Sequence, residues 1–189
     1  MFLRSADGGR TWSEPRTVAQ DPSGRLFNWD MRCGVRPDGR IDTFAWTYDR
    51  EAGAYLDIHH RIAAADASDV TPARPLGFAD QPGRPATLAD GRLVLPYVDR
   101  FDTGRILARM APRTDGEFGE PDVLHRQTSL SKSASAADDI LTQMSLWSYG
   151  LPWAEVLPDK DVLVVWYAGT PDRMDIHWAR ITVPDAATG

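Results

Sequence analysis

The chain has 189 residues, of which 42% are hydrophobic and 10% aromatic, so one ordinary domain core is within reach. A formal net charge of −6 argues against a nucleic-acid-binding surface. The single cysteine, Cys33, excludes an internal disulfide, and no apolar run approaches the roughly 20 residues of a membrane span. We therefore expect no nucleic-acid partner and no membrane segment. The N-terminus shows no signal-peptide pattern, which indicates a cytoplasmic protein if Met1 is the true start and leaves secretion open if it is not.

The first distinctive stretch is Ser5 to Trp12, which has the form Ser-x-Asp-x-Gly-x-Thr-Trp. We expect Asp7 to accept hydrogen bonds from later backbone N–H groups, and Gly8 and Gly9 to take the positive φ of a tight hairpin. Trp12 then restarts a strand, and we expect its indole to pack between sheets. The flanking segments 2–5 and 14–18 are predicted as the two strands of this hairpin.

Short strands and turns follow in three larger units. The first has a loop at 21–28, strands at 29–35, 41–48 and 55–63, and an eroded copy of the hairpin motif at 64–68. The second has strands at 84–88, 93–98 and 105–111, then a hairpin at 113–121 in which Phe118 takes the place of Trp12. The small, polar segment 127–141 reads as a flexible insertion. The third has strands at 147–156, 162–167 and 174–183.

These units are copies of one another, because the turns Asp38-Gly39, Asp90-Gly91 and Asp159-Lys160 occupy equivalent places. A repeat of about 40 to 50 residues built from about four strands is typical of propeller blades. The sequence therefore predicts a single all-β domain over residues 1–189. It should consist of four-stranded antiparallel sheets, three with inner strands and one outer half at the N-terminus.

The Ser5 to Trp12 motif resembles the Asp-box of bacterial neuraminidase (BNR) repeats, the hairpin signature of sialidase-like β-propellers. The stretch from Tyr149 to Asp159 is similar to the family's strand that carries the nucleophilic tyrosine. The resemblance implies about three to four blades of an incomplete six-bladed ring, corresponding to the C-terminal half. An open sector predicts either a missing N-terminal half or a homo-oligomer that completes the ring.

One face of such a propeller carries the loops that lead into the inner strands and those that join second to third strands. This rule selects our candidates for the site. Those near the inner strands are Asp30, Arg32, Gln81, Arg84, Trp147 and Tyr149, and those in the other loops are Tyr48, Asp49, Arg50, Tyr97, Asp99, Arg100, Phe101, Tyr167, Asp172 and Arg173. Neighbouring Asp and Arg residues could equally form structural salt bridges.

The family resemblance implies particular roles for some of these side chains. Tyr149 would be the nucleophile, and Arg32 and Arg84 would hold an acidic group of the substrate. The alternatives are that Tyr149 lines a sugar subsite and that the arginines bridge blades. Asp30 or Asp99 could instead act as the acid or base of another glycosidase type, and Gln81, Arg100 and Trp147 complete the substrate-binding candidates.

We predict no cofactor and no metal. His59 and His60 are adjacent on a strand and so point to opposite faces, and Cys33 reads as a small buried hydrophobe. The leading hypothesis is a sialidase-like exo-glycosidase with a carbohydrate substrate. The competing hypotheses are a non-catalytic BNR-repeat propeller that binds glycan or protein, and a truncated chain without activity. Convergence of Tyr149, Arg32 and Arg84 in one pocket would favour the enzyme.

Overall fold

The computed structural model describes residues 1–78, 81–100, 102–113, 116–127, 147–170 and 172–184. Within these ranges all regular structure is β, as the sequence predicts. The strands are β1 Leu26–Val35, β2 Ile41–Asp49, β3 Ala54–Tyr55, β4 His59–Ala63, β5 Arg74–Pro75, β6 Gln81–Pro82, β7 Ala86–Thr87, β8 Leu93–Asp99, β9 Arg105–Ala111, β10 Asp122–Arg126, β11 Tyr149–Val156, β12 Val162–Thr170 and β13 Arg173–Ile181.

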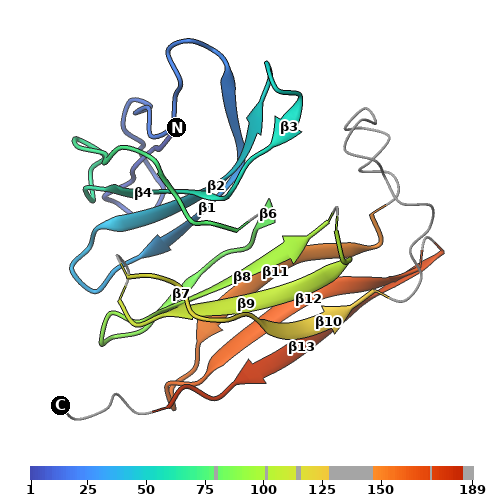
Figure 1. Cartoon of the computed structure of the whole chain (residues 1–189). Helices are drawn as coiled ribbons and strands as arrows, with labels where there is room; N and C mark the ends of the chain where they lie inside the picture. The colour runs from blue at the N-terminus through green and yellow to red at the C-terminus, as the bar shows by residue number, and fades with distance from the viewer. Residues whose placement is uncertain (79–80, 101, 114–115, 128–146, 171, 185–189) are drawn as a thin grey trace.

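The strands form three antiparallel sheets that follow one another in chain order (Figure 1). Sheet 1 has the order β1-β2-β4-β5, with β3 beside β2. Sheet 2 has the order β6-β8-β9-β10, with β7 also paired to β8. Sheet 3 has the order β11-β12-β13 among the described residues, one strand fewer than predicted.

The three sheets are structural copies, because the turn after each inner strand has the same hydrogen bonds. The outer backbone bond of this turn joins Arg36 to Arg40, Leu88 to Arg92 and Leu157 to Asp161, at 2.8 Å in each case. The carboxylates of Asp38, Asp90 and Asp159 each accept a bond from the backbone N–H two residues later. The predicted alignment of these turns is confirmed.

Each inner strand is also interrupted at the same place. Trp29 of β1 pairs with Trp46 of β2, and Arg32 pairs with Phe44. Between these two pairs β1 moves on by three residues while β2 moves by only two. In β11, Gly150 faces Tyr167 and Trp153 faces Val165, again three against two. Between β6 and β7, four residues advance against three. A one-residue bulge therefore recurs in all three sheets and turns the backbone out of the ladder.

The core lies between the sheets. Phe44 of sheet 1 packs with Leu93 and Leu95 of sheet 2, and Val94 and Val98 on the other face of β8 cluster with residues of sheet 3. Those sheet 3 residues are Ala154, Val162, Val164, Trp166 and Ala168. Alternate residues of one central strand thus fill two interfaces, as the period of two requires.

Sheets 2 and 3 approach each other closely at Gly83. A Cβ there would lie 2.3 Å from the carbonyl oxygen of Pro152, so only glycine fits. The predicted strand 84–88 is therefore wrong in part: two short pieces, β6 and β7, flank Gly83 to Pro85. The predicted strand 55–63 is likewise split, because Ile58 turns to bond Leu76 and Phe78 instead of β2. The predicted loop at 21–28 ends early, since β1 begins at Leu26.

The N-terminal hairpin differs from its prediction. As expected, Asp7 accepts bonds from the N–H groups of Arg10 and Thr11, at 3.0 and 2.9 Å, and both Gly8 and Gly9 have positive φ. Its flanking segments, however, form only a single bridge, Phe2 to Arg16, instead of two strands. Trp12 is 62% exposed and donates to the Gly9 carbonyl, so it does not pack between sheets. The segment 128–141 of the predicted insertion lies outside the described residues.

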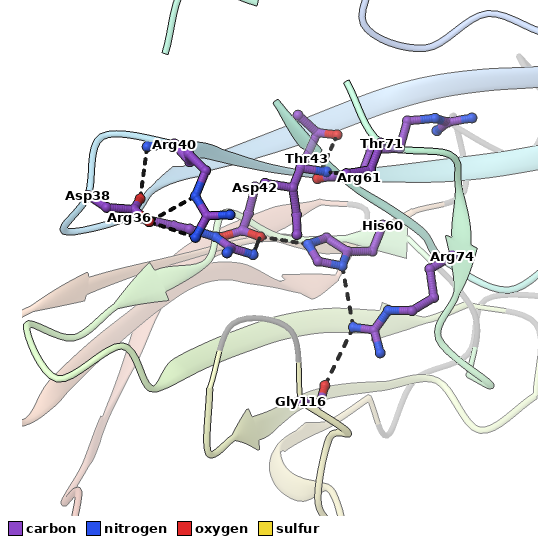
Figure 2. Close-up of polar contacts among 11 residues, drawn as sticks. Arg36, Asp38, Arg40, Asp42, Thr43, His60, Arg61, Thr71, Arg74 and Gly116 are labelled. Carbon is purple, nitrogen blue, oxygen red and sulfur yellow. Dashed lines mark hydrogen bonds and ion pairs between the residues drawn. The ribbon is translucent and has the colours of Figure 1, made fainter. Parts of the chain in front are cut away.

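A buried charge network ties the turn of sheet 1 to its third strand (Figure 2). Arg36 grips both carboxylate oxygens of Asp42, at 2.8 and 2.9 Å, and His60 Nε2 lies 2.6 Å from Asp42 Oδ1. The Asp42 and His60 side chains are at most 2% exposed. On the other ring nitrogen, Arg74 approaches His60 at 3.4 Å and also donates to the Gly116 carbonyl of sheet 2. These histidine contacts are structural.

Candidate functional site

A pocket of about 370 Å³ opens where the inner strands of the three sheets come together. We call it the axial pocket. All three sheets contribute to it, so it depends on the way the sheets are arranged and not on any one of them. Its lining residues are Trp29, Asp30, Trp46, Gln81, Arg100, Trp147, Leu151 and Tyr167.

The repeated bulge explains why these residues meet. Counted back from the equivalent turns, Trp29, Gln81 and Gly150 occupy one position of the repeat, and they pair with Trp46, Val98 and Tyr167. The next residue in sheets 1 and 3 is Asp30 and Leu151, and both have a φ of 47°. A non-glycine residue with positive φ is uncommon and typical of functional or tightly constrained sites. The bulge presents both side chains to the pocket.

Aromatic rings form one wall of the axial pocket. The rings of Trp29 and Trp46 stack with centroids 5.0 Å apart and planes inclined by 6°. Trp147 tilts against Trp46 at 5.8 Å. Since Trp46 is 1% exposed, it supports the wall from behind. Such flat apolar faces suit a ligand that has its own apolar face.

Polar groups form the rest of the lining. Asp30 accepts a hydrogen bond from the Gln81 amide and forms an ion pair with Arg32, at 2.6 Å. Gln81 in turn accepts a bond of 2.7 Å from Arg100 Nε. A carboxylate, an amide and a guanidinium are thus linked in a row across sheets 1 and 2. The row can both accept and donate hydrogen bonds toward the pocket.

Arg100 occupies the centre of this arrangement. Its Cζ lies 3.8 Å from the Trp147 ring centroid, and its Nη1 donates to the Tyr149 carbonyl at 3.0 Å. Gly150 makes room for it, because a Cβ there would lie 2.4 Å from Arg100 Nη2. Arg100 is only 8% exposed. Its bond to Tyr149 joins the loop after β8 to the start of β11.

The structure brings together five of the predicted site candidates in this lining, namely Asp30, Gln81, Arg100, Trp147 and Tyr167, and Arg32 pairs with Asp30. Tyr149 and Asp99, which were also predicted for the site, are not part of this lining. Tyr149 is 5% exposed, and its hydroxyl donates to the Asp99 carbonyl at 3.3 Å. The Asp99 carboxylate caps its own loop by accepting bonds from Asp102 and Thr103.

Arg84 stacks on Trp153, with Cζ 4.7 Å from the ring centroid, and pairs with Glu155. The condition that Tyr149, Arg32 and Arg84 share one pocket is therefore not met by the axial pocket. Several neighbouring Asp and Arg candidates also pair with other partners: Asp49 pairs with Arg25, and Arg173 with Asp175.

Trp29, Trp46 and Leu151 line the pocket but were not predicted as site residues. The available signal was the register of the repeat: Trp29 aligns with Gln81, and Leu151 follows Gly150. Counting residues back from the three Asp turns would have grouped these positions. The one-residue bulge, which sequence alone does not show, shifts which side chains face the pocket.

No known family and no curated protein matches the sequence. Solved structures do match. A protein of unknown function from Dyadobacter fermentans superposes with a TM-score of 0.69 at 23% identity, over 94% of this chain and 44% of that one. The intramolecular trans-sialidase from Ruminococcus gnavus, solved with oseltamivir carboxylate, gives 0.58 at 12% identity over 96% and 37%. The α-L-arabinanase of Penicillium chrysogenum, solved with arabinobiose, gives 0.54 at 16% over 96% and 54%.

The chain is a sector of a β-propeller. The propeller sector spans less than half the length of the first two of these structures. At these identities the likeness shows the fold alone. The predicted all-β sector of an incomplete ring is confirmed, with sheets 1 to 3 as its blades.

Two further observations bear on what the described residues could bind. In the described part of the chain, no group of three or more His, Cys, Asp or Glu side chains is arranged so that it could hold a metal ion. Within the same ranges, no helix has the length and apolar character that a membrane crossing needs. Cys33 is a free thiol, half-buried, and burial raises its pKa.

Proposed function

We propose that the axial pocket binds a carbohydrate. The observation that carries the proposal is the juxtaposition of stacked tryptophans with the row Asp30, Gln81 and Arg100. Sugars have apolar C–H faces that pack on aromatic rings, and their hydroxyls both donate and accept hydrogen bonds. The solved trans-sialidase and arabinanase with which the chain shares its fold act on carbohydrates, which supports the proposal as an analogy.

In this proposal each lining group has one task. Trp147, held in place by Arg100, and Trp29 present their rings to a sugar face. The Asp30 carboxylate accepts hydrogen bonds from sugar hydroxyls, while Gln81 and Arg32 keep it oriented. This proposal assigns no role to Tyr149, whose hydroxyl donates to the Asp99 carbonyl.

Binding fits the described lining better than catalysis does. Glycoside hydrolysis ordinarily uses two carboxyl groups about 5 to 9.5 Å apart on either side of the bond. Among the described residues of the lining, Asp30 is the one carboxylate. The second candidate function, an exo-glycosidase, is favoured by the position of Asp30 itself and needs a second acid from outside this lining.

Intrinsic tryptophan fluorescence tests the proposal, because three tryptophans line the pocket. The protein is titrated with arabinobiose and with 3'-sialyllactose, as a neutral and an acidic probe. We expect saturable quenching with one of them, and at least about tenfold weaker binding in Asp30→Asn and Trp147→Ala.

Trp12→Ala is the matched control, since Trp12 is exposed and lies outside the pocket. It should change the baseline fluorescence and leave the affinity unchanged. No response to either sugar, or equal affinities in Asp30→Asn and the wild type, would remove the proposal. Release of free sugar from either probe, lost in Asp30→Asn, would support the glycosidase instead.

A further inference from the structure

Sheet 3 presents an apolar face that no other sheet of the described chain covers; Arg84 stacks on one of its rings, that of Trp153. We call it the β11–β13 face and define it by Trp153, Val165, Met174, Ile176 and Trp178. Trp153 faces Val165, and Val165 faces Trp178, so these three side chains form one cross-strand row. Ile176 and Trp178 are 75% and 67% exposed, and Trp153 and Met174 are about half exposed. A contiguous apolar patch of this kind marks an interaction surface.

The equivalent faces of the other two sheets are buried. Val165 lies four residues after the turn residue Asp161, as Phe44 follows Arg40 and Pro96 follows Arg92. Phe44 is fully buried against sheet 2, and Pro96 is buried as well. In both cases the cover is the flat face of another β-sheet. The β11–β13 face therefore has the form of a surface that receives a second sheet.

The far end of the propeller sector does not complement this face. The side of sheet 1 that points away from sheet 2 carries Thr43 and Thr47, both buried, and the N-terminal segment lies against it. Phe2 and Leu3 of that segment share a pocket of about 310 Å³ with Cys33 and Val35. A covered and partly polar end would not match an exposed apolar one. The far end of a second copy would therefore not cover this face, whereas a second β11–β13 face is equally apolar and exposed.

We propose that two copies of this chain associate through their β11–β13 faces, related by a twofold axis. Such an isologous contact needs one self-complementary patch and closes on itself. Three strands of eight or nine residues span about 30 Å by 14 Å, or about 400 Å², before side chains are counted. This size lies below the standard of about 800 Å² per partner, so we expect a reversible dimer.

The oligomeric mass of the full chain tests this proposal, measured by light scattering from about 1 to about 200 µM protein. We expect a concentration-dependent dimer. Trp178→Arg places a charge within the patch and should weaken the dimer at least about tenfold, and Ile176→Glu should do the same. Both side chains are largely exposed, so the circular dichroism spectrum should not change.

Trp12→Arg is the matched control, because Trp12 has nearly the same exposure, 62%, at the other end of the sector. It should leave the dimer intact. A monomer at every concentration would overturn the proposal. So would a dimer that survives both face variants with unchanged spectra, or one that Trp12→Arg disrupts as strongly. None of these outcomes depends on whether the axial pocket binds a sugar.

Discussion

The guanidinium of Arg100 lies over the Trp147 ring, with Cζ 3.8 Å from the ring centroid. Because Arg100 also donates to Gln81 and to the Tyr149 carbonyl, it fixes a pocket ring and a pocket amide at once. A cation on an aromatic face contributes up to about 2 kcal/mol when it is desolvated. Arg100 is therefore a positioning residue of the axial pocket as well as part of its lining.

The first prediction uses Gly150 to displace Arg100. In Gly150→Ala the new Cβ would lie 2.4 Å from Arg100 Nη2 and 3.1 Å from Tyr167 Oη, so the guanidinium must leave its place over Trp147. We expect a changed tryptophan emission spectrum and sugar binding at least about tenfold weaker.

Gly39→Ala is the control for this change. Gly39 also has positive φ, at 83°, but a Cβ there would have open space within 4 Å. It should cost about 1 kcal/mol of unfolding free energy and leave the emission spectrum as it is. Equal spectra in the two variants would contradict the role given to Arg100.

A second prediction concerns the buried ion pair between Arg36 and Asp42. Asp42→Ala would leave the Arg36 guanidinium, 5% exposed, without its carboxylate, and would remove the partner of His60. Loss of one member of a buried pair costs about 3 to 5 kcal/mol. The measurement is the urea midpoint, with the slope checked for two-state unfolding.

Asp38→Ala provides the comparison in the same turn (Figure 2). Asp38 pairs with Arg40, and both side chains are about half exposed. An exposed pair contributes at most about 1 kcal/mol, so the midpoint should move only slightly. The prediction fails if the two variants lose comparable stability.

The third prediction is that Asp49 makes the stability of the fold depend on pH. Hydrogen bonds from Arg25, and then from the Ala52 N–H, lower the pKa of Asp49 from its ordinary 3.8 to about 2. A carboxyl with a depressed pKa stabilises the fold above its ordinary pKa, and that stabilisation is lost as the pH falls from about 4 to about 2. Asp49→Asn should lower the melting temperature at neutral pH and flatten its decline over this window. Melting temperatures that fall in parallel for variant and wild type would rule this out.

A fourth prediction addresses the contact between sheets 2 and 3. Gly83→Ala would place a Cβ 2.3 Å from the Pro152 carbonyl oxygen and 2.9 Å from that of Pro96, and neither backbone group can move away easily. Overpacking of this kind typically costs about 1 to 3 kcal/mol. In Gly119→Ala the nearest atom is 3.6 Å away, so that control should unfold like the wild type in urea.

The sequence was sufficient for the repeat, because Asp38, Asp90 and Asp159 each form the same side-chain to backbone bond within two residues. Local chemistry of this kind is visible in one stretch of chain. The strands β2, β8 and β9 were also predicted closely, since short apolar runs between turn residues can be recognised in a local stretch of chain. Trp12 shows the limit: its exposure depends on what lies beside the hairpin, which its own residues do not determine.

The candidate site was predicted only in part for the same reason. Asp30, Gln81 and Arg100 were found because they lie near loops on one face. The roles predicted for Arg84 and Tyr149 came from the family resemblance. In the structure Arg84 pairs with Glu155, and the Tyr149 hydroxyl donates to the Asp99 carbonyl. The inclusion of Trp46 and Leu151 depends on register shifts that arise only when the strands pair.

In a regular β-sheet, the identity of a side chain and the packing of the sheet face are usually coupled. The recurring bulge in β1 and β11 separates them at one position. The turned-out position holds Asp30 in one repeat and Leu151 in another, with the same backbone angle and opposite chemistry. The side chain there can therefore change without altering how one sheet stacks on the next. A duplicated unit built in this way can diversify its ligands while it keeps its architecture.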